Sequence, residues 1–338
     1  MRPWRLILAS TLAAGLAACG SSSTAPAPAR AACAWHAQRS GPRTTDDLTG
    51  VSFPDRRHGW AVGGISTPVI QATSDGGRRW RVQHAGGQNG LAAVSFVDDK
   101  HGWAAGAHNL LLVTTDGGSS WRAESLGVTR DGNLYGVRFV DRRHGWIVGS
   151  QGLIRATSDG GRTWATQTAG TSSDLQEVTF TDPLHGWIVA GDSEVLRTVD
   201  GGQSWTPVYR ASAQKNEIVA GVSCLDARRG WESGSQDDGQ SNHGVVSRTV
   251  DDGRTWKHYD ATNFDDVRFG AIAFVDALHG WVAGYQAELW YTDNGGVSWG
   301  SRPGPSTVSA ARVNQMVFRD ATHGWAVGAS GTIMACTA

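Results

Sequence analysis

Apolar and polar residues alternate in short runs along this chain, and the runs recur about every 43 residues. Runs such as Val51-Ser52-Phe53 and Val94-Ser95-Phe96 are each followed by an Asp and a short turn into a Gly-Trp pair. A period of two predicts strands. Further strands are predicted after each Gly-Trp pair, through stretches such as 152–157, and from the Trp that closes each Asp-Gly-Gly turn. Helical periodicity of useful length is absent after the first segment, so the pattern predicts an all-β protein with four strands in each repeat.

Two turn motifs define the repeat. The Gly-Trp pair occurs seven times, preceded by His in six copies and by Arg229 in the fifth, and its tryptophans are Trp60, Trp103, Trp146, Trp187, Trp231, Trp281 and Trp325. An Asp-Gly-Gly-x-x-Trp turn, or a close variant of it, follows some twenty residues later and ends at Trp80, Trp121, Trp164, Trp205, Trp256 and Trp299. Four-stranded repeats of 40 to 50 residues are typical of the blades of a β-propeller.

The Asp turn has a structural explanation. In the copy from Thr157 to Trp164, the two glycines permit positive φ angles and the Asp carboxylate can accept hydrogen bonds from the amides of its own turn. One carboxylate per turn is too few for Ca²⁺, which takes six to eight oxygen ligands. We therefore expect no metal, and a structural role for the residues at the Asp position, which are Asp75, Asp116, Asp159, Asp200, Asp251 and Asn294.

This turn, Ser/Thr-x-Asp-x-Gly-x-Ser/Thr-Trp, resembles the Asp-box or BNR repeat of sialidases and other propellers. The copies ending at Trp80 and Trp299 depart from it, at Arg79 and Asn294. Together with the Phe-x-Asp-x-x-His-Gly-Trp-x-Val-Gly element, it makes residues 33–338 similar to the photosystem II stability and assembly factor family. That resemblance implies a seven-bladed, non-enzymatic propeller with no cofactor.

The two ends of the propeller region complement each other. The last repeat stops after its third strand, at Ile333 to Ala338, while the segment from Cys33 to Gln38 resembles a fourth strand that lacks a blade. We expect the two ends to complete one blade. Cys33 and Cys336 would then face each other and form a disulfide, which export from the cytoplasm permits. Cys224 occupies the Phe position of the fifth repeat and is predicted to be a buried, inert thiol.

The first residues resemble an export signal. Arg2 and Arg5 precede an apolar stretch, and Leu16-Ala17-Ala18-Cys19 resembles the lipobox of bacterial lipoproteins. The resemblance implies a signal peptide over residues 1–18, cleavage before Cys19 and lipid attachment to its sulfur. Residues 19–32 are predicted to be a tether and residues 33–338 the propeller. The protein would be anchored to the outer face of the bacterial cell membrane or in the periplasm; the alternative is a signal peptide cut elsewhere.

The net charge and the positions of the histidines bear on two kinds of ligand, nucleic acid and a metal ion. The formal net charge of −1 gives no indication of a nucleic-acid partner. The six histidines before Gly-Trp lie in different repeats and cannot converge on one ion, so we expect each imidazole to bond to nearby backbone. The pairs Arg56-Arg57, Arg142-Arg143 and Arg228-Arg229 lie in the same turns. They form either solvated surface or a docking patch for an acidic partner.

If the protein has a ligand site, we expect it on the face opposite these turns; the alternative is that the long loop there is an ordinary disordered loop. The loops there vary most, and the fifth repeat carries a long polar insertion over residues 235–244. The residues predicted for this face are Asp237, Asp238, Asn242, His243, Arg268, Tyr285 and Trp290.

Three functions are compatible with the sequence. The preferred one is a non-catalytic, membrane-anchored, monomeric propeller that binds or helps assemble other envelope proteins. The second is an Asp-box glycoside hydrolase, similar to a sialidase, which needs placed carboxylates; no local pattern marks a catalytic residue among Glu194, Glu217, Glu288, Asp237 and Asp238. The third is a lectin that binds envelope glycans through exposed aromatic side chains.

Overall fold

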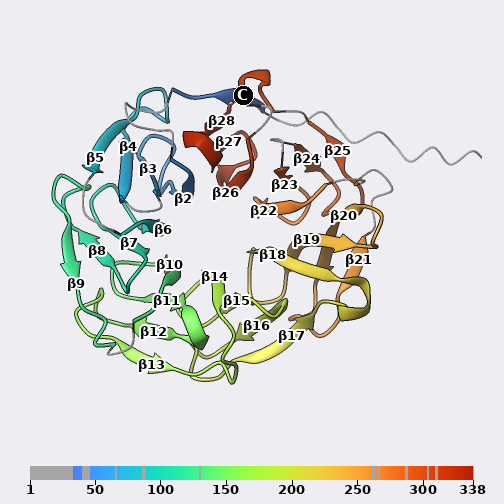
Figure 1. Ribbon diagram of the computed structural model, residues 1–338, viewed down its shortest axis with the longest axis horizontal. Coiled ribbons are helices and arrows are strands. Elements are labelled where there is room, and N and C mark those ends of the chain that lie inside the picture. The colour runs from blue at the N-terminus through green and yellow to red at the C-terminus, as the bar shows by residue number, and fades with distance from the viewer. Residues whose placement is uncertain are drawn as a thin grey trace, which may run out of the picture.

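The chain forms a closed ring of seven sheets. The computed structural model describes residues 33–39, 46–64, 67–85, 89–128, 131–259, 264, 267–285, 288–302, 304–308 and 311–337. Its strands make seven four-stranded antiparallel sheets around a central axis (Figure 1). The predicted seven-bladed all-β propeller is therefore confirmed. Within these described ranges no helix is long and apolar enough to cross a membrane.

In each blade the first strand lies nearest the axis and the fourth at the rim (Figure 1). Blades 1 to 3 consist of β2 (Leu48–Ser52), β3 (Gly59–Gly63), β4 (Val69–Thr73), β5 (Arg81–Ala85); β6 (Leu91–Phe96), β7 (Gly102–Gly106), β8 (Leu111–Thr114), β9 (Arg122–Glu124); and β10 (Leu134–Phe139), β11 (Gly145–Gly149), β12 (Ile154–Thr157), β13 (Ala165–Gln167). Blades 4 to 6 consist of β14 (Leu175–Phe180), β15 (Gly186–Ala190), β16 (Glu194–Thr198), β17 (Thr206–Arg210); β18 (Glu217–Cys224), β19 (Gly230–Asp237), β20 (Asn242–Thr249), β21 (Lys257–Tyr259); and β22 (Phe269–Phe274), β23 (Gly280–Gly284), β24 (Leu289–Thr292), β25 (Gly300–Ser301).

Blade 7 joins the two ends of the chain. Its strands are β26 (Val313–Asp320), β27 (His323–Gly328), β28 (Ile333–Thr337) and, at the rim, β1 (Ala34–Ala37). β1 pairs antiparallel with β28, with Trp35 opposite Cys336. Cys33 and Cys336 form a disulfide with 5.4 Å between their Cα atoms. In the chain-entropy model, a link across a loop of this length contributes about 5 to 6 kcal/mol as an upper figure.

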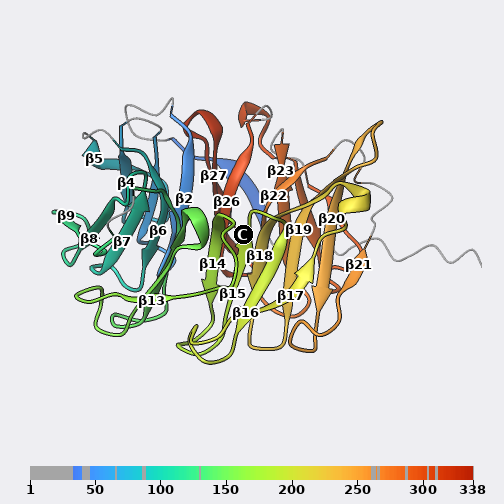
Figure 2. The same ribbon diagram turned by 60° about the horizontal axis from the view of Figure 1, so that its bottom comes forward.

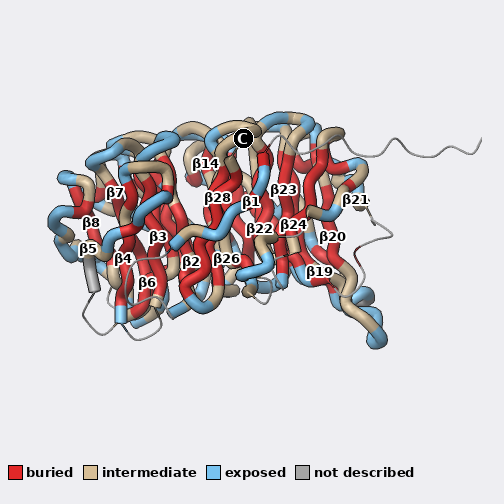
Figure 3. The backbone as a smooth tube through the Cα atoms, turned by 90° about the horizontal axis from the view of Figure 1, so that it is seen from above, coloured by how far each residue is buried: buried red, intermediate tan, exposed pale blue. Residues whose placement is uncertain are grey.

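Short 3-10 turns complete the secondary structure of the described residues. They are η1 (Ser150–Gly152), η2 (Ala213–Lys215), η4 (Ser306–Val308) and η5 (Ala329–Gly331). All lie in connections rather than in the sheets, which are covered on both sides by neighbouring blades. The second strand of blade 3, for example, is buried along its whole length, and Figure 3 shows buried strands between exposed turns.

Neighbouring blades are joined by stacked aromatic rings. Phe139 of blade 3 stacks on Trp103 of blade 2, with 3.5 Å between ring centroids and an interplanar angle of 5°. The edge of Phe139 meets Trp164 of its own blade at 6.0 Å. The Trp103 indole N–H donates to the carbonyl of Gly160 in the next blade's Asp turn at 3.3 Å. The same stack, with centroids 3.5 to 3.7 Å apart, occurs at four further joints: Trp60–Phe96, Trp146–Phe180, Trp231–Phe274 and Trp325–Phe53.

The joint between blades 4 and 5 departs from this arrangement. Cys224 stands where the other blades have Phe, so Trp187 has no ring to stack on. Instead Trp187 meets the edge of Trp256 at 5.8 Å, and the guanidinium of Arg197 lies 5.7 Å from its ring centroid. Because no Phe ring lies against it, Gly230 of the Gly-Trp pair in blade 5 also has more space around it than its counterparts in other blades.

Each Asp turn is held by bonds within itself. The Asp159 carboxylate accepts from the Thr157 hydroxyl at 2.8 Å, and from the Thr163 amide at 3.0 Å and hydroxyl at 2.7 Å. Gly160 and Gly161 have φ angles of 83° and 93°, a region that favours glycine. In blade 6, Asn294 accepts the equivalent bonds from Thr292 and Ser298. The carboxylate and amide side chains thus serve the same local purpose.

We predict that two equivalent glycines differ in their tolerance of alanine. A Cβ at Gly145 would lie 2.4 Å from the Phe139 ring, whereas one at Gly230 would meet nothing nearer than 3.6 Å. Overpacking of this kind costs about 1 to 3 kcal/mol. Gly145→Ala should therefore lower the free energy of unfolding by about that amount, and Gly230→Ala by much less, as measured by urea denaturation. Equal losses in the two variants would contradict the account of the joint.

Candidate interaction faces

The up-and-down order of the strands gives the ring two different faces. The turns between first and second strands and the Asp turns lie on one, which we call the hairpin face. The loops between second and third strands and the connections between blades lie on the other, which we call the loop face. Figure 2 shows the two sets of turns at opposite ends of the strands.

A carboxylate organises each first turn of the hairpin face. Asp141 accepts from the backbone N–H of Arg143 and of His144, both at 2.7 Å, and from Nδ1 of His144 at 2.8 Å. Burial alone would raise the pKa of Asp141, but the bonds from His144 and Arg143 outweigh it and lower the pKa. The same His–Asp contact occurs in five further blades, at His58, His101, His185, His279 and His323. The imidazoles therefore bond to a carboxylate and not, as expected from the sequence, to backbone.

The paired arginines contribute ion pairs between blades. Nε of Arg142 lies 2.6 Å from a carboxylate oxygen of Asp98 in blade 2, and Nε of Arg56 lies 2.8 Å from Asp320 in blade 7. Both side chains remain more than 60% exposed, so each pair adds little stability. Because the arginine pairs belong to blades 1, 3 and 5, the turns of other blades separate them.

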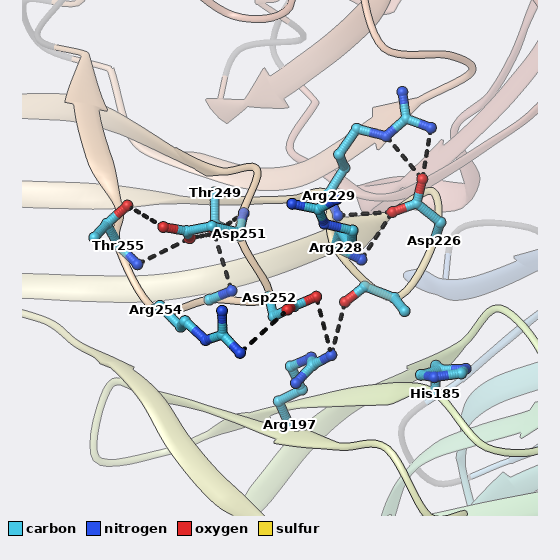
Figure 4. Close-up of polar contacts among 12 residues, drawn as sticks. His185, Arg197, Asp226, Arg228, Arg229, Thr249, Asp251, Asp252, Arg254 and Thr255 are labelled. Carbon is cyan, nitrogen blue, oxygen red and sulfur yellow. Dashed lines mark hydrogen bonds and ion pairs between the residues drawn. The ribbon is translucent and has the colours of Figure 1, made fainter.

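A cleft opens on the hairpin face between blades 4 and 5. Its volume is about 380 Å³, and its wall includes Arg197, Val199, Pro207, Asp252 and Arg254. Arg197 donates to the carbonyl of Ala227 at 2.9 Å and lies 3.4 Å from Asp252, whose other oxygen lies 3.9 Å from Arg254 (Figure 4). The cleft thus combines two guanidinium groups, one carboxylate and aliphatic side chains.

The long hairpin of blade 5 gathers four of the predicted ligand-face residues at its tip, which projects from the loop face (Figure 3). Asp238 accepts from the amides of Gln240 and Ser241 at 2.8 Å, and lies 3.1 Å from Nε2 of His243. Asp237 accepts from the Gly239 amide and pairs with Asn242 across the strands. The tip is therefore an ordered, polar projection.

Beside this hairpin, blades 6 and 7 place an exposed tyrosine ring next to an arginine side chain. Tyr285 is 45% exposed, and the guanidinium carbon of Arg312 lies 5.7 Å from its ring centroid. The Tyr285 amide donates to the carbonyl of Arg268 at 3.3 Å, which places Arg268 alongside. The sequence reasoning missed Arg312, although it stands in blade 7 where Arg268 stands in blade 6: the Ala329 amide donates to the carbonyl of Arg312 as the Tyr285 amide donates to that of Arg268.

Trp290 does not belong to this face. It is 8% exposed and meets the Phe264 ring edge-on at 4.9 Å, within the packing between sheets. Every residue of β24 is buried, because blades cover this strand on both sides. The prediction for Trp290 is therefore wrong.

The central channel is lined by the first strands. A cavity of about 460 Å³ there is bordered by Arg138, Glu177 and Cys224 among others. Arg138 donates to the Phe180 carbonyl at 3.3 Å. Burial raises the pKa of Glu177 to about 7, against the opposing bond from the Val222 amide, and raises the pKa of Cys224 to about 11. Cys224 is half-buried at the channel wall, less enclosed than predicted, but its thiol stays protonated at neutral pH.

Comparison with known proteins identifies the family. The family model of photosynthesis system II assembly factor YCF48 matches residues 27–129 and 122–258, more than half of the chain. The chain belongs to this family. A search of curated proteins found no match.

Solved structures of YCF48 proteins share the fold. The structure described as "YCF48 bound to D1 peptide" is 21% identical with a TM-score of 0.73, covering 90% of this chain and 97% of that one. YCF48 from Cyanidioschyzon merolae is also 21% identical, with a TM-score of 0.70 and coverages of 90% and 98%. A GH74 xyloglucanase from Xanthomonas campestris is 14% identical, has a TM-score of 0.67, and aligns over 89% of this chain and 53% of its own.

In this YCF48-family propeller a buried polar cluster occupies the joint between blades 4 and 5. The Tyr209 hydroxyl donates to Glu217 at 2.5 Å and Glu217 also accepts from the Ser212 amide at 3.0 Å. Glu232 is fully buried beside them, and Ser247 contacts Nδ1 of His258 at 3.1 Å. Burial, with the nearby Glu217 charge, raises the pKa of Glu232 to about 8. A sequence signal existed, since Glu232 stands where all other blades have Ala, Ile or Val after the Trp.

The cluster does not form an accessible catalytic pair. Glu217 is 8% exposed and Glu232 is 0% exposed, so no substrate can reach either carboxylate without opening the joint. Glu194, at 3% exposure, forms an ion pair with Arg210. In the described residues no group of three His, Cys, Asp or Glu side chains could hold a metal ion.

We predict that Glu232 makes the fold less stable as the pH rises. The unfolded chain releases this proton near its ordinary pKa of 4.5, whereas the folded protein holds it to about pH 8. The raised pKa therefore leaves the free energy of unfolding undiminished below pH 4.5 and lowers it progressively as the pH rises from 4.5 to 8. Relative to Glu232→Gln, the wild type should lose about 1.4 kcal/mol per pH unit within that window. Urea unfolding at pH 5, 6.5 and 8 measures this, and parallel profiles for the two proteins would contradict it.

Proposed function

We propose that this chain is an exported, lipid-anchored propeller that binds another protein of the cell envelope and supports its assembly without catalysing a reaction. The observation that carries the proposal is the grouping of exposed polar and aromatic side chains on the loop face of blades 5 to 7. Asp238, His243, Tyr285 and Arg312 supply charge and an aromatic surface there. Aromatic residues and Arg are the side chains most enriched at binding hot spots.

The relatives support a protein partner. The family is that of an assembly factor, and one member of the fold has a structure in which it is bound to a D1 peptide. An identity of 21% carries the fold but not the partner, so we leave the identity of the bound protein, and any photosynthetic role, to experiment.

The anchor rests on the sequence. The lipobox-like segment from Leu16 to Cys19 lies outside the described residues and remains part of the proposal. Two or more acyl chains on Cys19 would hold the protein stably at a membrane, whereas a single chain would not.

Catalysis is left out of the proposal for a physical reason. Glycoside hydrolysis requires two carboxyl groups on either side of a bound sugar. Glu194, Glu217 and Glu232 are buried, and Asp237 and Asp238 are engaged in the turns of the hairpin tip. The xyloglucanase shares the ring, and a ring alone does not confer its chemistry.

We predict that partner capture depends on the loop face. The combined variant Asp238→Ala, Tyr285→Ala, Arg312→Ala should reduce recovery of crosslinked partner from native membranes about tenfold or more, since hot-spot truncations cost at least 1 to 2 kcal/mol each. Thr166→Ala, an exposed rim position of blade 3, is the matched control. Quantitative mass spectrometry of the captured proteins is the readout.

Three results would count against the proposal. The first is equal recovery by the combined variant and the control. The second is capture of glycan with no protein, which would favour a lectin. The third is turnover of glycoside substrates by the wild type that the loop-face variant loses.

A further inference from the structure

The hairpin face divides into two sectors of different chemistry. Just before the His or Arg that precedes Gly-Trp, blades 1 to 3 have Arg57, Lys100 and Arg143. At this position blades 4 and 6 have Leu184 and Leu278, each 52% exposed. The change from cation to leucine occurs at turns of the same shape, so the fold does not require it.

The Asp turns repeat the division. Between the Thr and the Asp, blades 1 to 3 have Ser or Thr, whereas blades 4 and 5 have Val199 and Val250, which are 48% and 49% exposed. In blade 6 that position holds Asp293, and the exposed aliphatic residue is Val297 at another position of the same turn, at 52%. Seven large hydrophobic side chains of the described residues are exposed, and five of them are these: Leu184, Val199, Val250, Leu278 and Val297. We call this set the apolar sector.

Cations lie within and beside the apolar sector. Arg228 is exposed in the first turn of blade 5, and the Arg254 side chain is 79% exposed in the Asp turn of that blade. Arg57, Lys100 and Arg143 continue the positive side chains into blades 1 to 3. Aliphatic side chains at turn tips together with Arg and Lys suit an anionic lipid surface, where apolar groups enter the interface and cations meet phosphates.

The shape of the hairpin face suits a flat surface, such as a membrane, better than an extended peptide. The turn tips of successive blades end at a common level, seen along the upper edge in Figure 3. Val199 lies in the wall of the cleft between blades 4 and 5, whereas the other four apolar side chains come from four further turns in three blades, so the set is spread across the face.

The chain enters the ring at this face. Thr337 pairs with both Ala34 and His323, and His323 belongs to the hairpin-face turn of blade 7. Cys33 therefore lies at the hairpin-face end of blade 7, which packs beside blade 6. Fully extended, residues 19–32 would span about 50 Å. An anchor at Cys19 would thus keep the entry point on this face within about 50 Å of the membrane.

We propose that the apolar sector docks on the lipid surface to which the chain is anchored, with its five aliphatic side chains in the headgroup region and Arg228 and Arg254 at anionic phosphates. This inference rests on the anchor in the proposed function. Docking in this orientation turns the loop face away from the membrane, where it can meet a partner protein.

A depth measurement tests the docking. The intact lipidated chain is placed in vesicles of equal phosphatidylglycerol and phosphatidylcholine, with bimane attached through Val250→Cys. Ser158→Cys, at the same repeat position in blade 3, is the matched control. Nitroxide lipids should quench bimane at position 250 at least about threefold more than at position 158, since only an interfacial group reaches them. Adding Leu184→Asp and Leu278→Asp should abolish the difference.

The other outcomes separate the two proposals. If the protein sediments with vesicles but both positions are quenched equally, the anchor stands and the docking is overturned. If the protein purified from membranes carries no acyl group and does not sediment with vesicles, both the anchor and the docking are contradicted. Protection of position 250 in native membranes but not in pure lipid vesicles would assign the apolar sector to a protein partner and overturn lipid docking.

Discussion

The stack between a Phe of one blade and a Trp of the blade before it is the interaction on which the ring depends. Each Phe is enclosed on three sides: Phe139 meets Trp103 on one face, Gly145 on the other and Trp164 at its edge. A buried aromatic side chain of this size contributes about 3 kcal/mol, and an aromatic pair about 0.5 to 1.5 kcal/mol more. The indole N–H also bonds to the next blade's Asp turn, so one Trp fixes both a ring and a turn.

The packing between neighbouring blades, repeated around the ring, determines which positions can vary in sequence. The turns of the hairpin face contact the neighbouring blade through Trp indoles and through Arg56 and Arg142, so their backbone is nearly the same in every repeat. Their outward side chains are free to change, which is how a basic and an apolar sector arise on one scaffold. The loop face lies away from the joint and can lengthen, as the hairpin between β19 and β20 does.

Much of the fold could be predicted because each sequence repeat corresponds to one blade. The strands, the blade number and the pairing of β1 with β28 follow from motif spacing and from one missing copy. The loss of Phe at Cys224 was visible too. Its consequence for Trp187 and Gly230 was not, because that depends on how a neighbouring blade fills the space.

The sites were less predictable. The place of Asp238 and His243 in a projecting hairpin could be predicted because an insertion is conspicuous in a regular array. Trp290 was assigned to the surface wrongly, because a strand covered on both sides has no polar alternation to mark its outside. The His turns were assigned the wrong acceptor, since a turn offers both carbonyls and a carboxylate. Tyr209 and Glu217 come from different blades, and only packing brings them together.

The central claim, that aromatic stacking couples neighbouring blades, is tested most directly by a double-mutant cycle on Trp103→Leu and Phe139→Leu. Free energies of unfolding from urea denaturation of the wild type, both single variants and the double variant give the coupling between the two rings. The account predicts a favourable coupling of about 0.5 to 1.5 kcal/mol. A coupling of zero, with the two losses simply adding, would contradict it.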